Sequence, residues 1–400
     1  IELPSLEDIL KDREAFAKAY NLQSKELDPF SGKIVVQKNG KKFVVQNQVP
    51  FPLSQEEMDA IYDLDYVRTY HPSYEKYGGQ FSVISCRGCF GSCSFCAIHS
   101  HQGRIIQTRS HESIIREAKK ITELPNFKGY IHDVGGPTAN FRHPSCAKQL
   151  KVGVCRDRQC LFPKPCPNLD TDHSDYIALL QKVRALSGIK KVFVRSGIRY
   201  DYLLADKNDR FLDELCRYHV SGQLKVAPEH VAEHALANMG KPGKSVYLKF
   251  MRAFNKKNQE IGLKQFLVPY FISSHPGCTL RDAVELSEFL RDIGHQPEQV
   301  QDFIPTPGSA STAMYYSGIN PETGKKVFVA RNPHDKAMQR ALMQYKNPKN
   351  RQLVKEALQQ TNRGDLIGDD AKCLLKISSS HNPKARHSKI AFNPKINKRR

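Results

Sequence analysis

The run Cys86-Arg-Gly-Cys89-Phe-Gly-Ser-Cys93-Ser-Phe-Cys96 places Cys89, Cys93 and Cys96 in the spacing C-x3-C-x2-C. Thiolates are the usual protein ligands of iron–sulfur clusters. Three of them in so short a loop can hold three corners of a cubic 4Fe–4S cluster, which leaves one iron without a protein ligand. An open coordination position is typical of a catalytic metal centre. The loop therefore predicts a catalytic 4Fe–4S site.

A zinc knuckle is the alternative interpretation of this loop. Cys86 or His99 is available as a fourth ligand, and paired cysteines are common in zinc sites. The surrounding pattern favours the cluster, because an apolar strand precedes the loop and alternating strands and helices follow it.

Short apolar segments alternate with helical segments from Phe81 onward. The expected strands are 81–86, 129–134, 191–195, 223–227, 265–272 and 299–304, and the expected helices are 111–124, 175–186, 211–219, 245–261 and 280–293. Strands separated by helices imply parallel pairing with right-handed crossovers. The sequence therefore predicts an α/β fold, and its six units resemble the partial (β/α)6 barrel of radical SAM enzymes. The cysteine loop follows the first strand, so it falls at the carboxyl ends of the strands, where barrels carry their active sites.

Four regions are expected along the chain. Residues 1–80 form an N-terminal extension, with helices over 6–20 and 55–64 and a β-hairpin at Asn39-Gly40, a pair that tolerates positive φ. Residues 81–320 form the core of alternating strands and helices, which resembles the radical SAM core. Residues 321–375 form a C-terminal helical region, with helices over 333–345 and 349–360. Residues 376–400 form a basic tail that is expected to be disordered.

Composition indicates a soluble, cytoplasmic protein. The chain has 400 residues and a mean hydropathy of −0.53, and no run of 18 apolar residues predicts a membrane span. Its start, Ile1-Glu-Leu-Pro, lacks the features of a signal peptide. It also lacks an initiator Met, which indicates a fragment of a longer protein or a processed form. Eleven cysteines without a secretion signal favour metal binding in a reducing compartment over a disulfide framework.

The formal charge of +20 is unevenly distributed. Residues 371–400 contain nine Lys or Arg and no Asp or Glu. Two interpretations of this tail stay open, a solvated tail and an arm that binds RNA.

The spacing C-x3-C-x2-C resembles the signature of the radical S-adenosylmethionine (radical SAM) superfamily. The resemblance implies that the amino and carboxylate groups of SAM chelate the open iron. It also implies that an electron, delivered by a donor of the flavodoxin or ferredoxin type, splits SAM to give a 5′-deoxyadenosyl radical. In that family the residue before the third cysteine, here Phe95, lies near the adenine.

Gly135 and Gly136, at the end of the second expected strand, are candidate SAM-binding residues. Neither has a Cβ, so the backbone can approach a ligand closely. In the superfamily a Gly-Gly-Glu-type motif at this point binds the amino group of SAM. Here Pro137 replaces the acidic residue, so backbone carbonyls would have to make the contact. An ordinary turn at the end of the strand is the alternative.

Arg195 and Ser196 end the third expected strand, and Glu229 follows the fourth. Polar side chains at these positions can bond the ribose or the carboxylate of SAM. For Glu229 the alternative is an acid in the first turn of a helix, where it stabilises the helix dipole.

A second cysteine group lies between the second and third expected strands, in a proline-containing loop. Its members are Cys146, Cys155, Cys160 and Cys166. Zinc, an auxiliary iron–sulfur cluster and free thiols are all open for this group, because the spacings follow no standard zinc pattern.

The chain resembles the YgiQ family of radical SAM proteins over residues 1–375. The resemblance rests on the cysteine loop, on Asp133-Val-Gly-Gly-Pro-Thr-Ala139, on the segment from Cys155 to His173, on Lys225-Val-Ala-Pro-Glu-His230 and on Asp302-Phe-Ile-Pro-Thr-Pro-Gly308. The family implies cofactors but no substrate. We therefore expect an enzyme that cleaves SAM reductively, with an unknown substrate. The alternatives are a radical SAM enzyme that modifies tRNA, and a nucleic-acid-binding protein stapled by zinc.

Overall fold

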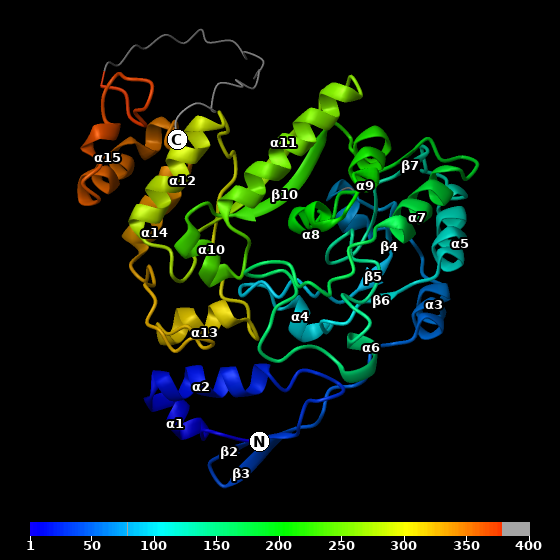
Figure 1. Ribbon diagram of the computed structural model, residues 1–400, viewed down its shortest axis with the longest axis horizontal. Coiled ribbons are helices and arrows are strands. Elements are labelled where there is room, and N and C mark those ends of the chain that lie inside the picture. The colour runs from blue at the N-terminus through cyan, green and yellow to red at the C-terminus, as the bar shows by residue number, and fades with distance from the viewer. Residues whose placement is uncertain (78, 378–400) are drawn as a thin grey trace. The chain divides into compact units, whose positions relative to one another are not determined.

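The computed structural model describes residues 1–77 and 79–377 of the chain (Figure 1). The chain divides into two units, each with its own core. The first unit comprises Ile1–Glu229, Ala237–Tyr270 and Pro305–Lys326, and the second comprises His230–Leu236, Phe271–Ile304 and Val327–Arg400. The expected basic tail falls almost wholly on residues 378–400, outside the described residues.

The N-terminal region contains β1 (Glu2–Leu3), α1 (Leu6–Lys11), α2 (Arg13–Ser24), β2 (Val35–Asn39), β3 (Lys42–Gln46) and α3 (Gln55–Asp63). The helix expected over 6–20 is in fact two helices. Asp12 separates them, because its backbone is extended and its side chain accepts a hydrogen bond from Glu14 N. The hairpin is confirmed, but its two loop residues are Gly40 and Lys41, since Asn39 still pairs with Lys42.

The first unit contains short strands that pair two by two. Its strands beyond β3 are β4 (Ser82–Ile84), β5 (Cys86–Arg87), β6 (Gln107–Thr108), β7 (Tyr130–Ile131), β8 (Asp133–Gly135), β9 (Lys191–Val192) and β10 (Gln223–Glu229). β4 pairs in parallel with β8, and β7 pairs in parallel with β9. The strands expected over 81–86 and 129–134 are each divided in two. Parallel pairing is therefore confirmed.

Helices lie between these strands and continue after β10, in the alternating order that the pattern predicts. They are α4 (Ile98–His101), α5 (His111–Thr122), α6 (Gln149–Val152), α7 (Ser174–Arg184), α8 (Tyr200–Ala205), α9 (Arg210–Glu214), α11 (Lys244–Glu260) and α13 (Ala310–Ser317). α5 and α7 lie side by side in the first unit (Figure 1). The last part of the helix expected over 211–219 is a π-helical turn, Leu215–His219. α10 (Glu233–Met239) and β11 (Phe266–Ser273) each contribute residues to both units.

Two buried arginines fix the strand that leads into the cysteine loop. Arg142 Nη1 donates to Ser85 O at 2.7 Å, and Arg109 Nη1 donates to Ile84 O at 2.9 Å. Carbonyls buried without partners are costly, so these bonds stabilise the chain where β4 ends. The following residues therefore start from a fixed position.

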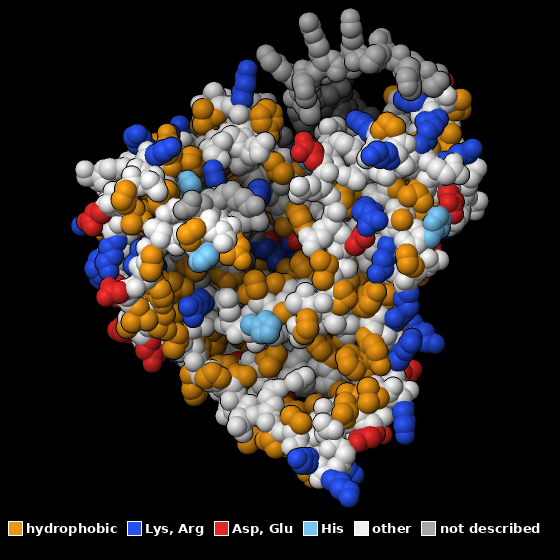
Figure 2. All heavy atoms as spheres, turned by 180° about the vertical axis from the view of Figure 1, so that it is seen from behind, with side chains coloured by type: hydrophobic (Ala, Val, Ile, Leu, Met, Phe, Trp, Pro, Cys, Tyr) orange, Lys and Arg blue, Asp and Glu red, His pale blue; other side chains and the backbone are white. Residues whose placement is uncertain are grey.

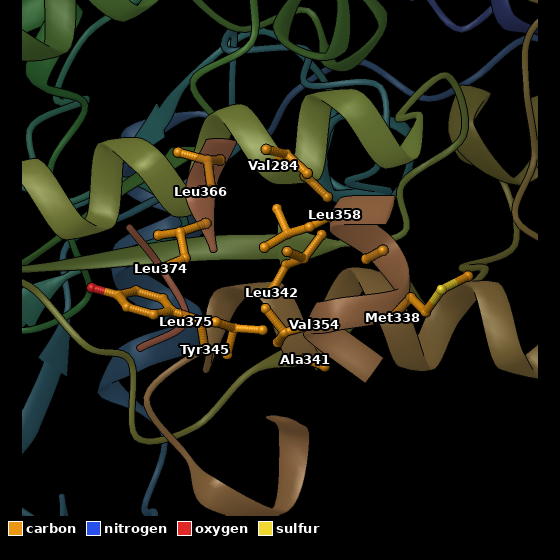
Figure 3. Close-up of a cluster of buried hydrophobic side chains, with 12 residues drawn as sticks. Val284, Met338, Ala341, Leu342, Tyr345, Val354, Leu358, Leu366, Leu374 and Leu375 are labelled. Carbon is orange, nitrogen blue, oxygen red and sulfur yellow. The ribbon is translucent and has the colours of Figure 1, made fainter. Parts of the chain in front are cut away.

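The second unit is built around α12 (Leu280–Asp292), α14 (Pro333–Met343) and α15 (Arg351–Gln360), and in it β11 pairs in parallel with β12 (Gln301–Asp302). Figure 3 shows its core, where Val284, Leu342 and Leu358 point toward one another. α14 and α15 match the helices expected over 333–345 and 349–360. Leu342 and Leu358 are fully buried, so this core excludes water.

The fold is α/β, with the strand and helix order of a partial (β/α)6 barrel. Lys and Arg side chains are spread over one face of the molecule, among hydrophobic and acidic side chains (Figure 2). The described residues on that face therefore carry mixed charge. Within the described residues, no helix combines the length and hydrophobicity needed to cross a bilayer.

Candidate functional site

The three cysteines of the C-x3-C-x2-C motif lie in the loop between β5 and α4. β5 pairs antiparallel with β6, which closes the base of this loop. Cys89 N donates to Gly103 O at 3.0 Å, and Cys96 N donates to Cys93 O at 3.1 Å. Backbone hydrogen bonds therefore fix the positions of the cysteines before any metal binds.

Two glycines of the loop are required by close contacts. Gly88 has a φ of +87°, and a Cβ there would lie 2.6 Å from Ile105 O. A Cβ at Gly91 would lie 2.8 Å from Arg199 Nη1 and 3.3 Å from Cys89 Sγ. A larger residue at position 91 would therefore separate a cation from the cysteines.

Arg199 is a buried cation beside these cysteines. Its Nη1 donates to Cys93 Sγ at 3.0 Å, and its Nε donates to Asp201 Oδ1 at 2.7 Å. Burial by itself lowers the pKa of Arg199, but Asp201 and Cys93 outweigh burial and raise that pKa well above its ordinary value. The guanidinium therefore stays charged. A charge-assisted hydrogen bond to sulfur stabilises the thiolate, which is the form that binds metal.

A buried hydrogen-bond chain holds Arg199 from behind. Arg199 N donates to Asn140 Oδ1 at 2.8 Å, and Asn140 Nδ2 lies 3.1 Å from His173 Nε2. His173 Nδ1 lies 2.9 Å from Asp206 Oδ2. Burial lowers the pKa of His173, so the ring is neutral, with Nε2 accepting and Nδ1 donating. Such outer partners orient the groups that contact a metal site.

The donor set fits a cubic cluster. Among the described residues, no three His, Cys, Asp or Glu side chains are grouped closely enough to hold a single metal ion. A cubane takes one thiolate on each of three irons, so its ligands stand further apart than those of one ion. Burial raises the pKa of Cys89, and it raises that of Cys96 to about 11. A metal must therefore displace protons from these thiols when it binds.

Cys86, the proposed fourth ligand of a zinc knuckle, belongs to an apolar core. It is fully buried with Phe90 and Phe141, whose rings stack with centroids 3.7 Å apart. Burial raises the pKa of Cys86 to about 11. For His99, burial is the main cause that lowers the pKa to about 4.

Gly135 and Gly136 are packed against other parts of the chain. A Cβ at Gly135 would overlap Ser196 Oγ, and a Cβ at Gly136 would lie 2.6 Å from Cys86 Sγ. Neither glycine has a positive φ. Close internal packing is therefore a sufficient reason for both glycines. Their expected contact with SAM stays a prediction.

Arg195 and Ser196 lie on the exposed turn after β9. Asp133 Oδ1 accepts hydrogen bonds from Arg195 N at 2.7 Å and from Ser196 N at 3.2 Å, so this carboxylate fixes the turn. The Arg195 guanidinium lies over the Phe193 ring, 5.4 Å from its centroid. Phe95 is partly buried in the cysteine loop. For these three residues too, a contact with SAM stays a prediction.

Glu229 ends β10 in a strained and buried conformation. Its φ is +68°, which is rare for a residue other than glycine, and 5% of the residue is exposed. Its Oε1 lies 3.9 Å from Lys241 Nζ, and its Oε2 has no hydrogen-bond partner among the described residues. Burial raises the pKa of Glu229, while Lys241 and Arg199 lower it. Strain of this kind is concentrated at functional sites.

Sequence reasoning missed Arg199, Asp201 and Lys241. The pair Arg199-Tyr-Asp201 follows the third expected strand by four residues, at the end where active-site residues gather. That position could have identified Arg199 and Asp201 as candidate site residues. Lys241 follows Met239-Gly240, and no local pattern marks it as a site residue.

Three family models match stretches of this chain. A model described as "Radical SAM superfamily" matches residues 83–290, and one described as "Radical SAM N-terminal" matches residues 1–83. The chain belongs to the radical SAM superfamily. Radical SAM proteins use a 4Fe–4S cluster and SAM, so these are the cofactors of this chain. A further model, "Domain of unknown function (DUF3362)", matches residues 298–394.

Curated relatives of this radical SAM protein are UPF0313 proteins. One from Clostridium perfringens (strain ATCC 13124) is 52% identical over 395 residues, which are 97% of this chain and 60% of that protein. One from Clostridium botulinum (strain 657 / Type Ba4) is 54% identical over 382 residues, 94% of this chain and 60% of that protein. The chain thus spans about three fifths of the length of these relatives. They confirm the resemblance to the YgiQ family.

Two solved radical SAM structures are similar to this chain. The cobalamin-dependent S-adenosylmethionine radical enzyme OxsB, with aqua-cobalamin bound, is 11% identical, with a TM-score of 0.47 over 83% of this chain and 51% of that chain. The radical S-adenosylmethionine methyltransferase TsrM from Kitasatospora setae, with cobalamin and [4Fe-4S] cluster bound, is 12% identical, with a TM-score of 0.43 over 81% of this chain and 71% of that chain.

Proposed function

We propose that this chain cleaves SAM reductively at a 4Fe–4S cluster held by Cys89, Cys93 and Cys96. The observation that carries the proposal is the Arg199 guanidinium, buried, paired with Asp201 and bonded to Cys93 Sγ at 3.0 Å. When bound, the one-electron-reduced cluster supplies the electron that breaks the C5′–S bond of SAM, giving methionine and a 5′-deoxyadenosyl radical that takes hydrogen from substrate. Arg199 stabilises the thiolate form of a cluster ligand.

Glu229 is the strongest candidate for a contact with SAM. Its buried Oε2 is available to a hydroxyl or amino group of a ligand, and Lys241 supports the carboxylate from the other oxygen. A buried acceptor without a partner is costly, and a bound donor removes that cost. Arg195 and Ser196 are proposed for the ribose or carboxylate of SAM, Gly135 and Gly136 for its amino group, and Phe95 for its adenine.

We propose a one-electron donor of the flavodoxin or ferredoxin type, and the cytoplasm as the location. None of the eleven cysteines, all of which lie in the described part of the chain, is paired in a disulfide, and cysteines kept for metal binding suit a reducing compartment. The substrate is unassigned, and RNA is the class to test first because the chain carries +20. The division into an extension at 1–80, a core at 81–320, a helical region at 321–375 and a tail at 376–400 also remains our proposal.

The test is SAM cleavage without oxygen. The reconstituted chain, given SAM and a strong reductant, should release 5′-deoxyadenosine and methionine, measured by chromatography. The triple variant Cys89→Ala/Cys93→Ala/Cys96→Ala should release neither. Glu229→Gln should keep its iron but bind SAM more weakly, whereas the exposed matched control Glu14→Gln should behave as the wild type. Zinc in place of iron, or no cleavage by a fully reconstituted wild type, overturns the proposal.

A further inference from the structure

Four cysteines outside the site described above gather in one place in the first unit. A cavity of about 30 Å³ is lined by Ser145, Cys146, Lys148, Gln149, Gly153, Cys155, Arg158, Gln159, Cys160, Cys166 and Leu169. All four members of the second cysteine group are among these residues, although they come from separate turns of the loop that contains α6. Folding has therefore brought the four thiols around one space.

The loop that carries these cysteines is held firmly by the N-terminal region. Asp28 is 1% exposed, and its Oδ2 accepts a hydrogen bond from Val154 N at 2.8 Å. Glu26, 2% exposed, pairs with Arg156, and Lys25 pairs with Asp157 at 2.8 Å. Buried carboxylates with fixed partners are expensive to rearrange. The cavity is consequently part of a built structure.

Hydrogen-bond donors and cations surround the cavity. Lys148 Nζ donates to Cys155 Sγ at 3.7 Å, whereas the Cys160 thiol donates to Ser145 Oγ at 3.3 Å. Arg104 donates to Cys155 O at 2.9 Å and to the carbonyl of Arg158 at 3.0 Å. Four thiolates carry four negative charges, which nearby cations and donors stabilise.

We infer that Cys146, Cys155, Cys160 and Cys166 hold a second iron–sulfur cluster. Zinc requires four sulfur atoms to converge within about 2.3 Å of one point. An iron–sulfur cluster is a body of iron and sulfide that fills a space between four thiolates. Cysteines that line the walls of a shared cavity match the second requirement. With four protein ligands no iron is open, so this centre does not chelate SAM.

The second cluster adjoins the first site through an aromatic core. Cys89 belongs to the first site and Cys160 to the second. Both pack against a group of buried hydrophobic side chains that contains Phe90, Phe141 and Tyr202. These aromatic rings contact one another, with the Phe141 and Tyr202 centroids 5.2 Å apart. The two metal sites therefore share one rigid support.

Metal analysis of two complementary variants tests this inference. The full chain is reconstituted without oxygen from ferrous iron and sulfide, with zinc measured in the same samples. The wild type should hold about eight irons, as two cubanes require. Cys89→Ala/Cys93→Ala/Cys96→Ala should keep about four irons, about four sulfides and a paramagnetic signal after reduction. Cys146→Ser/Cys155→Ser/Cys160→Ser/Cys166→Ser should keep about four of each at the first site.

The outcomes separate this inference from the proposed function. Iron retained by the first variant supports the second cluster even if SAM is never cleaved. Zinc, or no metal, at the second site of a folded first variant overturns it. If the first variant does not fold, the quadruple serine variant decides, because a folded quadruple variant that keeps all of the wild-type iron overturns the inference. Cys373→Ala, at a buried cysteine outside both groups, is the matched control and should keep wild-type iron.

Discussion

Replacing Arg199 by Gln should loosen the cluster at Cys89, Cys93 and Cys96. Arg199 makes two contacts that glutamine cannot reproduce with a charge, one to Cys93 Sγ and one to Asp201 Oδ1. The change removes the cation but keeps a polar side chain. It also leaves the Asp201 carboxylate, 3% exposed, without its counter-charge.

The magnitude follows from the lost bond. A hydrogen bond to a charged group contributes about 1.5–3 kcal/mol. Since about 1.4 kcal/mol corresponds to a tenfold change, cluster retention should weaken about 10- to 100-fold, as is usual for the outer partners of a metal ligand. Leaving Asp201 unpaired should destabilise the first unit by a further ~3–5 kcal/mol.

Competition with an iron chelator measures how tightly each variant retains its cluster iron. Reconstituted wild type and Arg199→Gln are titrated with chelator without oxygen, and retained iron is counted at each concentration. The double variant Arg199→Gln/Asp201→Asn removes both charges, so it should recover most of the lost stability while still losing iron early. If Arg199→Gln holds iron as tightly as the wild type, Arg199 does not support the cluster.

Three further predictions concern packing and titration. Gly135→Ala should destabilise the first unit by about 1–3 kcal/mol because its methyl group would overlap Ser196 Oγ and lie 2.6 Å from Asp133 Oδ2. Ser196→Gly in the same chain should reverse part of the drop in melting temperature, and no reversal at all would show that contact with Ser196 is not the source of the strain. Leu342→Ala should lower the stability of the second unit by about 2–5 kcal/mol in urea unfolding, and a loss below ~1 kcal/mol would mean that its core is looser than described. Burial lowers the pKa of His230 to about 4 from an ordinary 6.5. The free energy of unfolding should therefore be at its full value above pH 6.5 and should fall by roughly 3 kcal/mol as the pH drops toward 4. In unfolding curves measured at several pH values, His230→Gln should make the free energy of unfolding depend less on pH in this acid range. An unchanged pH dependence would show that His230 is not its source.

The alternation of strands and helices could be predicted from the sequence because apolar periodicity reports burial directly. The residues at which helices and strands begin and end could not be predicted in this way. The break at Asp12 depends on a side chain that caps a helix start in the middle of a helical pattern. The hairpin shifted because Gly40 occupies the first loop position with a φ of +60°, as in a type II′ turn, instead of sharing the turn with Asn39. Local composition does not distinguish these neighbouring registers.

The cysteine loop was equally readable, since three cysteines adjacent in sequence are adjacent in space. The residues from distant parts of the chain that contact this loop could not be predicted. Arg199 reaches Cys93 across 106 positions, and no local pattern encodes that contact. The two glycines of Asp133-Val-Gly-Gly show the opposite problem. Their sequence predicted room for a ligand, but Ser196 and Cys86 lie close enough to require glycine without one.

The contacts between the N-terminal region and the loop of the second cysteine group also affect the order in which parts of the chain fold during synthesis. Asp28 leaves the ribosome 126 residues before Val154, and Glu26 leaves it 130 residues before Arg156. Until those partners emerge, the two carboxylates have only local donors, Phe30 N and Ser31 N for Asp28 and Lys33 N for Glu26, so the contacts that bury them are incomplete. This part of the N-terminal region therefore completes its contacts only after the middle of the chain has been translated.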